Sequence, residues 1–305
     1  MLKKTIRIGT RDSELALWQA NTVKAKLENL GYSTQLVPVK SEGDLVLDKP
    51  LYEMGITGIF TKTLDVAMIR GTVDIAVHSM KDVPTQLPNG IVQTAVLERA
   101  SSDDILVTTN EVDFEKPCTI ATGSLRRQAQ WLNRYPHHKV VDIRGNVNTR
   151  LQKLKDNNWQ GAIFAKAGLL RINLLPEKFM DLSWMLPAPA QGAMVVVALE
   201  KDEFCKEATS KLNNRKAQIC TQMERDFLRT LEGGCTAPIG AFAQIIDQEV
   251  VFKGCLFSLD GKQKLEIEKT IDIENYNGFG KECAHHILKN GGSELMVQIK
   301  KEINK

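Results

Sequence analysis

The sequence predicts an α/β fold with two lobes around a cleft, followed by a small α+β domain. The chain has 305 residues, enough for two domains or for three small ones. Strand-like and helix-like segments alternate between residues 5 and 165, which is typical of mainly parallel sheets covered by helices. Two segments, near residues 97–102 and 187–191, would carry the chain between the lobes, as paired hinges do in proteins that close around a ligand. We therefore expect ligands to bind in the cleft.

The first lobe begins with residues 5–9, which alternate like a strand. A helix is expected to start at Ser13, to carry apolar residues at helical spacing and to end at Gly31. The next segments are predicted as a strand at 34–39, a helix at 60–70 and a short buried strand at 73–77. This order of elements makes the first lobe α/β.

The second lobe repeats this alternation after Glu98. Strands are expected at 105–108, 119–122, 140–143 and 162–165, and helices at the segments that begin with Ser124 and Asn146. The second lobe is therefore also predicted to be α/β.

The proline-rich segment MLPAPAQG (185–192) precedes an apolar strand at 194–199, which we interpret as a return to the sheet of the first lobe. A long amphipathic helix then begins near Asn213 and stops at Gly233-Gly234, and strands and a final helix at 276–289 follow. We expect residues 1–96 and 189–207 to form the first lobe, 97–188 the second lobe and 208–305 the C-terminal α+β domain.

The composition is that of an ordinary soluble globular chain, with 43% hydrophobic and 25% charged residues. Forty basic residues against 37 acidic ones leave a net charge of +3, which argues against a nucleic-acid partner. The N-terminus has no apolar stretch of signal-peptide length, and the longest strongly apolar run, 193–199, is far too short to span a bilayer. We expect a cytoplasmic protein without a membrane partner.

The six cysteines form no CxxC pair, so the sequence predicts neither a disulfide framework nor a zinc site. Most of them should be reduced and buried. Cys235 differs, because it follows a helix end in the glycine-containing segment LEGGCTAP (231–238) and should be accessible. An accessible thiol becomes nucleophilic only beside cations, so on position alone we favour a buried loop cysteine over a reactive one.

Basic side chains follow several predicted strands where the chain turns into a helix. They are Arg126, Arg127, Arg144 and Arg150 in the second lobe, and Arg11, with the neighbouring Ser13, in the first. Helix N-termini favour anions, and guanidinium groups bind carboxylates and phosphates bidentately. The pattern indicates a ligand with several anionic groups, although each arginine alone could be a solvated surface charge. The glycines match neither nucleotide-binding pattern, GxGxxG or GxxxxGK[ST].

The segment HSMKDVP (78–84) follows the strand at 73–77, which places Lys81 and Asp82 at a strand end beside the expected cleft. A carboxylate there can move protons or hold a developing cation, and the lysine can bind an anion. A capped turn with a surface ion pair is the alternative. We interpret His78 as structural, and no metal site is expected, because the other histidines lack partners at a metal-binding spacing.

Five segments together resemble the porphobilinogen deaminase, or hydroxymethylbilane synthase, family. They are IGTRDSELALWQ (8–19), DIAVHSMKDVPT (74–85), GSLRRQAQ (123–130), DIRGNVNTRLQKL (142–154) and LEGGCTAPIGA (231–241). They occur in order and span nearly the whole chain, and HSMKDVP with LEGGC is a strong signature. The resemblance implies two lobes similar to periplasmic binding proteins and a C-terminal domain that bears a cysteine.

The resemblance also implies a transferase that condenses porphobilinogen head to tail into hydroxymethylbilane, with loss of ammonia, in haem biosynthesis. The family is primed by a dipyrromethane cofactor on a thioether, which by motif match would be formed by Cys235. Asp82 would be catalytic: it would bond pyrrole N–H groups, stabilise the cation formed as ammonia leaves and assist proton transfer. The resemblance suggests a monomer with no obligate protein partner.

Because each pyrrole carries an acetate and a propionate, the resemblance gives the basic residues a ligand. The residues expected to bind the cofactor are Lys81, Ser124, Arg126, Arg127 and Arg144, and those expected to bind the substrate are Arg11, Ser13 and Arg150.

The sequence departs from the family pattern at several positions. Thr57 replaces a lysine, which puts any anion contact from that segment in doubt, and Asp103 stands where an arginine is common. Asp65 stands for a glutamate and Ala190 for a glycine. None of these changes removes Asp82, Cys235 or the arginines.

Two other classes of protein compete with this interpretation. A solute-binding protein without catalysis would suit the lobes and the arginines, but its export signal is not found. A nucleotide-dependent dehydrogenase would need a glycine fingerprint that the sequence does not show. The mass of the purified protein discriminates between a deaminase and a binding protein, because a deaminase carries two covalently attached pyrrole units.

Overall fold

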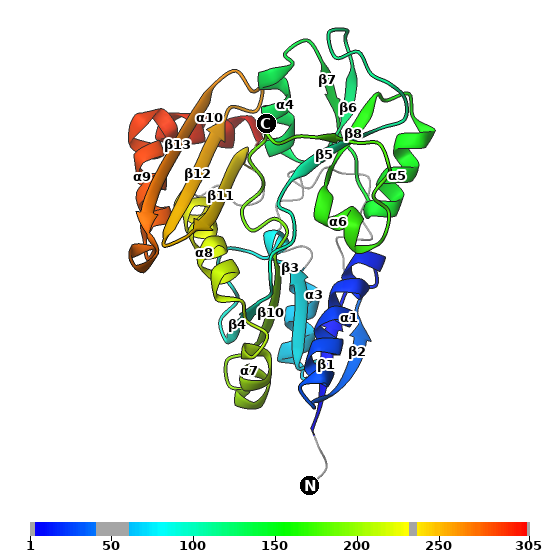
Figure 1. The fold of residues 1–305 in the computed structure, drawn as a ribbon, viewed down its shortest axis with the longest axis vertical. Coiled ribbons are helices and arrows are strands. Elements are labelled where there is room, and N and C mark those ends of the chain that lie inside the picture. Colours follow the sequence, from blue (N-terminus) through cyan, green and yellow to red (C-terminus); the bar gives the residue numbers. More distant parts are fainter. Residues whose placement is uncertain (1–3, 41–60, 232–236, 304–305) are drawn as a thin grey trace. The chain divides into compact units, whose positions relative to one another are not determined.

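The structure is a computed structural model that describes residues 4–40, 61–231 and 237–303 (Figure 1). The chain divides into two compact units. Of the described residues, the first unit holds 4–40, 61–100 and 192–218, and the second holds 101–191, 219–231 and 237–303.

The first unit contains a five-stranded sheet in the order β2-β1-β3-β10-β4. Its strands are β1 (Thr5–Thr10), β2 (Ser33–Pro38), β3 (Ile75–Ser79), β4 (Ile91–Val96) and β10 (Met194–Leu199). The predicted return of 194–199 to this sheet is confirmed. The sheet is mixed, however, because β10 runs antiparallel to both of its neighbours, and the sequence analysis missed β4.

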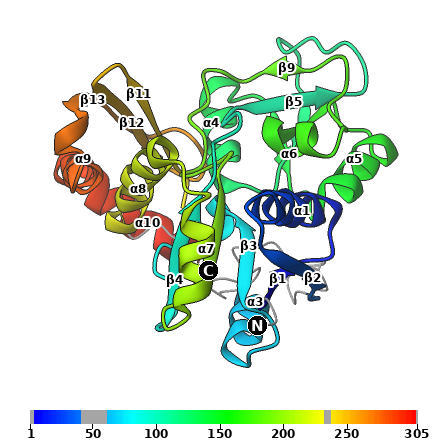
Figure 2. The ribbon, with the colours of Figure 1, turned by 60° about the horizontal axis from the view of Figure 1, so that its bottom comes forward.

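Helices cover both faces of this sheet (Figures 1 and 2). They are α1 (Glu14–Asn29), α3 (Lys62–Ile69) and α7 (Glu203–Ser210). Buried residues of α1 and α7 share one apolar cluster with Ile8 of β1. The neighbouring Gly9 faces the other way, and a Cβ atom there would lie 3.0 Å from Leu64 of α3. The helix α3 therefore packs on the opposite face.

The second unit contains two sheets. The first has the order β7-β6-β8-β5-β9, with parallel pairs β6–β7 and β6–β8 and antiparallel pairs β5–β8 and β5–β9. Its elements are β5 (Asp104–Thr108), β6 (Thr119–Ala121), α4 (Leu125–Arg134), β7 (Lys139–Val141), α5 (Val147–Asp156), β8 (Gly161–Ala165), α6 (Lys166–Arg171) and β9 (Met180–Asp181).

The other sheet of the second unit is antiparallel, in the order β11-β12-β13. Three helices pack against it around one apolar core. The elements are β11 (Ile239–Ile246), β12 (Glu249–Phe257), β13 (Lys264–Asp272), α8 (Arg215–Thr230), α9 (Phe279–Ile287) and α10 (Ser293–Ile303). The sequence analysis expected one terminal helix; α9 and α10 are separated by a kink, with Gly291 at a φ of +99°.

Glu224 connects the C-terminal sheet to the segment before β10. Its side chain is wholly buried, and its two carboxylate oxygens accept hydrogen bonds from the backbone N–H groups of Ala190 and Ala243, each at 2.7 Å. The backbone N–H of Ala241 donates to Pro187 O at 3.0 Å. These bonds hold residues 187–190 against β11.

The α/β fold class with a smaller C-terminal α+β part is confirmed. The division into three domains stays a prediction. No helix among the described residues is long and apolar enough to cross a membrane. The five cysteines outside 232–236 are reduced and buried, as the sequence predicts: Cys118, Cys205, Cys220, Cys255 and Cys283.

Candidate functional site

Two strand-to-helix turns of the second unit lie side by side. The strands β6 and β7 are parallel neighbours, so both turns leave the same edge of the sheet. Thr122 N donates to Val141 O at 2.9 Å, and a Cβ atom on Gly123 would lie 2.8 Å from Ile143 O. The predicted meeting of the two turns is confirmed.

The same turns start α4 and α5, and both starts are capped as their residue types predict. Ser124 Oγ accepts from Arg127 N at 3.5 Å, and Asn146 Oδ1 accepts from Thr149 N at 2.9 Å. Two positive helix ends therefore share one edge of the sheet, an arrangement that favours anions.

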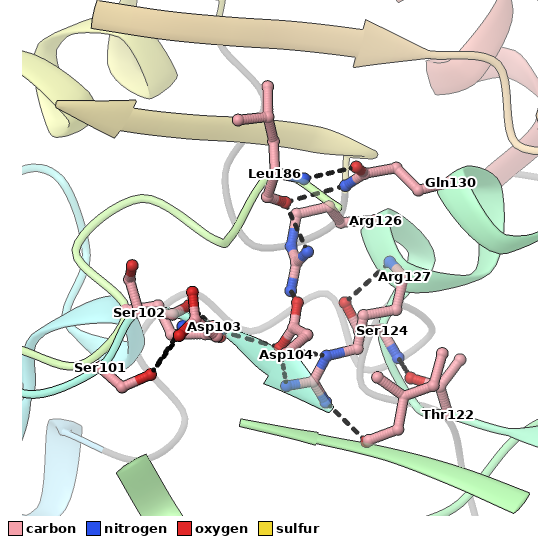
Figure 3. A network of polar contacts seen from close by, with 12 residues as sticks. Ser101, Ser102, Asp103, Asp104, Thr122, Ser124, Arg126, Arg127, Gln130 and Leu186 are labelled. Carbon is pink, nitrogen blue, oxygen red and sulfur yellow. Dashed lines mark hydrogen bonds and ion pairs between the residues drawn. The ribbon is translucent and has the colours of Figure 1, made fainter. Parts of the chain in front are cut away.

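Arg126 and Arg127 are both buried and both contact Asp104, the first residue of β5 (Figure 3). Arg126 Nη2 lies 2.7 Å from Asp104 Oδ2. Arg127 binds Asp104 Oδ1 through Nη2 at 2.7 Å and through Nε at 3.1 Å. The sequence analysis offered surface charge as the alternative for each arginine, and burial of both side chains rules it out for this pair.

Backbone carbonyl groups accept hydrogen bonds from the Nη1 atoms of both guanidinium groups. Arg126 Nη1 donates to Leu186 O at 2.7 Å, and Arg127 Nη1 donates to Ile163 O at 3.0 Å. Gln130 forms two bonds with Leu186, one to its O at 2.9 Å and one from its N at 2.8 Å (Figure 3). The loop at Leu186 is thus attached directly to α4.

The arginine pair has one more positive charge than its shared carboxylate neutralises. Burial lowers the pKa of Arg126, Asp104 raises it again, and the charge of Arg127 lowers it. Arg126 Nε is also buried and has no hydrogen-bond acceptor among the described residues. A ligand carboxylate would suit both the surplus charge and this donor, so the residues present fit a cofactor that carries acid side chains.

Arg144 and Arg150 belong to the second turn. Arg144 is buried; burial lowers the pKa of its guanidinium, and Asp142 raises it. Arg150 is half-buried, and its Nε donates to Gly145 O at 2.8 Å. Gly145 has a φ of +113°, a conformation that favours glycine and that lets the chain turn between the two arginines.

In the first unit, β1 and β3 are parallel neighbours, so the residues that follow them leave the same sheet edge. Arg11 follows β1, and the hydroxyl of Ser13 caps α1 by accepting from Ala16 N at 3.4 Å. Lys81 and Asp82 lie in the short turn Met80–Asp82 that directly follows β3. All four predicted residues are half-buried and belong to one edge of this sheet.

His78 is buried within β3, as the structural interpretation expects. Burial, together with the positive charge of Arg11, lowers its pKa to about 4. The imidazole is therefore neutral at physiological pH.

The structure brings the predicted site residues together in two groups, one in each unit. Cys235 and Thr57 lie outside the described residues. The sequence analysis missed Asp104, Gln130 and Gln191, which bind the arginines or the segments beside them. One signal was available for Asp104, because an acidic residue directly before the apolar run of β5 is placed to begin a buried strand.

The fold and these basic strand ends define an α/β protein equipped for a polyanionic ligand. Residues 6–207 match the family model "Porphobilinogen deaminase, dipyromethane cofactor binding domain", and residues 218–289 match "Porphobilinogen deaminase, C-terminal domain". The chain belongs to the porphobilinogen deaminase family.

Similar sequences agree with this assignment. The chain is 40% identical over 299 residues to the porphobilinogen deaminase of a Nitratiruptor species, covering 95% of this chain and 96% of that protein. It is 37% identical over 316 residues to the porphobilinogen deaminase of Chlorobium phaeobacteroides, covering 98% and 99%.

Solved structures give a looser likeness. An amino-acid ABC transporter extracellular-binding protein from Bacillus subtilis overlaps with a TM-score of 0.41 at 13% identity, over 68% of this chain and 90% of that one. The periplasmic VFT2 domain of Bordetella pertussis BvgS overlaps with a TM-score of 0.39 at 10% identity, over 68% and 86%. Neither likeness contributes to the functional assignment.

The family establishes the activity that the sequence motifs imply. The protein is a transferase of tetrapyrrole biosynthesis that condenses porphobilinogen into hydroxymethylbilane with release of ammonia, and it has a dipyrromethane cofactor. The competing interpretations as a solute-binding protein and as a dehydrogenase are thereby set aside.

Proposed function

We propose that this protein binds the acetate and propionate groups of its cofactor and of the growing pyrrole chain through the basic and hydroxyl groups at its strand ends. The observation that carries this proposal is the adjacency of the α4 and α5 starts, which gathers buried guanidinium groups at two positive helix ends. A ligand with two carboxylates on each ring matches such a set of groups.

The roles divide between two sets of residues. We assign to the cofactor carboxylates the buried or capping residues of α4 and α5, together with the lysine after β3: Ser124, Arg126, Arg127, Arg144 and Lys81. We assign to the incoming substrate and the growing chain the half-buried residues Arg11, Ser13 and Arg150. The half-buried side chains retain access to solvent, as binding of successive substrate molecules requires.

Cys235 is proposed as the attachment point of the cofactor through a thioether. Three of the other cysteines are poor candidates, because burial raises the pKa of Cys205 and Cys255 to about 12 and that of Cys283 to about 11, which leaves their thiolate populations negligible. When bound, the cofactor supplies the terminal pyrrole carbon on which condensation begins.

Asp82 is proposed as the catalytic carboxylate. In each condensation the methylene carbon of porphobilinogen loses ammonia and bonds to a free pyrrole carbon, which then releases its proton. Positive charge therefore develops on pyrrole N–H groups while the reaction proceeds. A carboxylate at the end of β3 can accept hydrogen bonds from these groups, stabilise the charge and take the proton.

We further propose that the protein acts as a cytoplasmic monomer, with no metal, nucleic acid or obligate protein partner. Its near-neutral charge of +3 supports independence from nucleic acid. Light scattering coupled to size exclusion tests the monomer, and a dimer mass would overturn that part.

The intact mass of the purified protein tests the cofactor attachment. The parent should carry the added mass of two pyrrole units, and Cys235→Ser should lose it while its fold is kept. The matched control is Cys118→Ser, because Cys118 Sγ lies within donating distance of the backbone carbonyls of Asp113 and Lys116 and a serine can donate to the same groups. An adduct retained by Cys235→Ser would contradict the assignment.

A further inference from the structure

Asp104, which the sequence motifs do not identify as a site residue, binds both members of the arginine pair. Its carboxylate is wholly buried at the start of β5 and contacts Arg126 at 2.7 Å and Arg127 at 2.7 and 3.1 Å. Gln191 Nε2 also donates to Asp104 Oδ1 at 2.9 Å and to Ser102 O at 2.6 Å. One carboxylate thus joins β5 to α4 (Figure 3) and, through Gln191, to the segment that leads to β10.

The two arginines use their donors differently. Arg127 directs Nε and Nη2 to Asp104 and Nη1 to Ile163 O, so all three of its nitrogens bind the protein itself. Arg126 is held at Nη2 by Asp104 and at Nη1 by Leu186 O, while its buried Nε has no hydrogen-bond acceptor among the described residues. Arg126 is therefore the member of the pair with a buried nitrogen, Nε, that has no acceptor among the described residues.

The electrostatic balance requires Asp104. Two buried guanidinium groups repel each other strongly where water is excluded, and a single carboxylate between them offsets that repulsion. If Asp104 were neutral, the pair would separate or draw in solvent. With Asp104 ionised, both arginines stay in place and one positive charge remains for a ligand anion.

We propose that Asp104 is a positioning residue for cofactor binding: it fixes the Arg126–Arg127 pair so that the Nε–H group of Arg126 can donate to a carboxylate of the cofactor. This inference rests on the proposed carboxylate-binding role of Arg126. The hydrogen bonds of Arg127 then hold Asp104 and β8, and Arg127 contributes to binding of the cofactor carboxylates through its positive charge.

The test compares Asp104→Asn with Asp103→Asn. The neighbouring Asp103 is exposed and its carboxylate bonds to Ser101 Oγ at 2.8 Å, so its variant controls for the loss of one charge at this position in the chain. Each protein is prepared without its cofactor and incubated with porphobilinogen, and the gain of covalent mass is followed over time. The apparent KM is then measured on protein that carries the cofactor. Urea unfolding reports the stability of each variant separately.

We expect Asp104→Asn to gain the covalent mass at least about tenfold more slowly than the parent, or to show an apparent KM at least about tenfold higher with kcat changed less than about threefold. Asp103→Asn should match the parent. A merely structural Asp104 would lower the urea midpoint but leave the mass-gain rate and KM of the folded protein unchanged, and that result would overturn the proposal.

A charge-matched double variant covers the case in which Asp104→Asn does not fold. Asp104→Asn with Arg127→Gln keeps one net positive charge among residues 104, 126 and 127 and replaces the Asp104–Arg127 ion pair by a neutral amide pair. The proposal predicts slow mass gain here too, because no carboxylate holds Arg126; mass gain within about threefold of the parent would overturn it.

The variant Arg126→Ala distinguishes a failure of the proposed carboxylate site from a failure of the positioning role of Asp104. Normal mass gain and KM in Arg126→Ala would refute the proposed carboxylate site itself. Impaired Arg126→Ala beside a normal Asp104→Asn would refute only the positioning role of Asp104.

Discussion

Gly123 and Ile143 approach so closely that a Cβ atom on Gly123 would lie 2.8 Å from the Ile143 carbonyl oxygen. This approach joins the turn before α4 to the turn before α5. It therefore links the start of α4, which carries Arg126, to the turn that carries Arg144. A methyl group at this point would push the two turns apart.

We therefore expect Gly123→Ala to slow cofactor assembly and to destabilise the protein by about 1–3 kcal/mol, the usual cost of overpacking. Intact mass and urea unfolding measure the two effects. Gly71→Ala is the control: its φ of +69° strains an alanine, but the added Cβ would meet no atom within 4 Å. Gly71→Ala should lose stability and still assemble the cofactor. Equal assembly in both variants would show that the spacing of the turns is unimportant.

Replacing Arg126 or Arg144 with alanine should stall cofactor assembly or chain extension and raise the sensitivity to salt. Each buried arginine that binds a carboxylate leaves an unpaired buried anion when it is removed, at a cost of about 2–5 kcal/mol. The effect is measured as turnover and chain elongation at salt concentrations from about 50 to about 300 mM. Parent-like elongation in both variants would contradict their role in the site.

We expect Glu224 to contribute to the stability of the fold without taking part directly in catalysis. Glu224→Gln keeps the size of the side chain but turns an N–H donor toward the N–H of Ala190 or Ala243, so we expect a loss of about 2–4 kcal/mol of unfolding free energy. The exposed Glu249 gives the control, and Glu249→Gln should change the free energy by less than about 0.5 kcal/mol. Similar urea midpoints for both variants would refute the bridging role.

His78 predicts a pH dependence of stability. Its pKa falls from 6.5 in the unfolded chain to about 4 in the folded protein. Above pH 6.5 the imidazole is neutral in both states, so its contribution to stability is fully present; as the pH falls toward 4 the unfolded chain takes up the proton first, and the contribution is lost. The loss over this window should be about 3 kcal/mol.

Urea unfolding between pH 7.5 and 4.5 measures this loss. His78→Gln should flatten the pH profile, whereas His285→Gln should leave it unchanged because His285 is exposed. An unaltered slope in His78→Gln would show that other groups cause the acid sensitivity.

Local sequence signals predicted the starts of the main helices. Ser13, Ser124 and Asn146 each cap a helix through a side chain that reaches only three residues along the chain, so the signal and the structure lie together in the sequence. The shared edge of β6 and β7 followed in the same way, because strands in a βαβ unit are parallel.

Long-range pairing was beyond the same reasoning. The direction of β10 depends on its neighbours β3 and β4, about a hundred residues earlier, and an apolar run is the same in either direction. Asp104 likewise meets Arg126 and Gln191 only in the folded chain. Sequence alone could not show whether Arg127 faces solvent or a buried carboxylate.

We expect Asp82 to stabilise the cation formed as ammonia leaves, while the arginines hold the carboxylates. Asp82→Asn keeps the size and some hydrogen bonding of the side chain but removes its negative charge and its capacity to accept the proton. Porphobilinogen binding and folding should change much less than the rate, because other residues provide them.

The most direct measurement is single-turnover condensation by Asp82→Asn protein that already carries its cofactor, compared with the parent at saturating porphobilinogen. We expect a rate lower by about two orders of magnitude or more, the usual scale for such groups. A rate within about threefold of the parent would remove Asp82 from the mechanism.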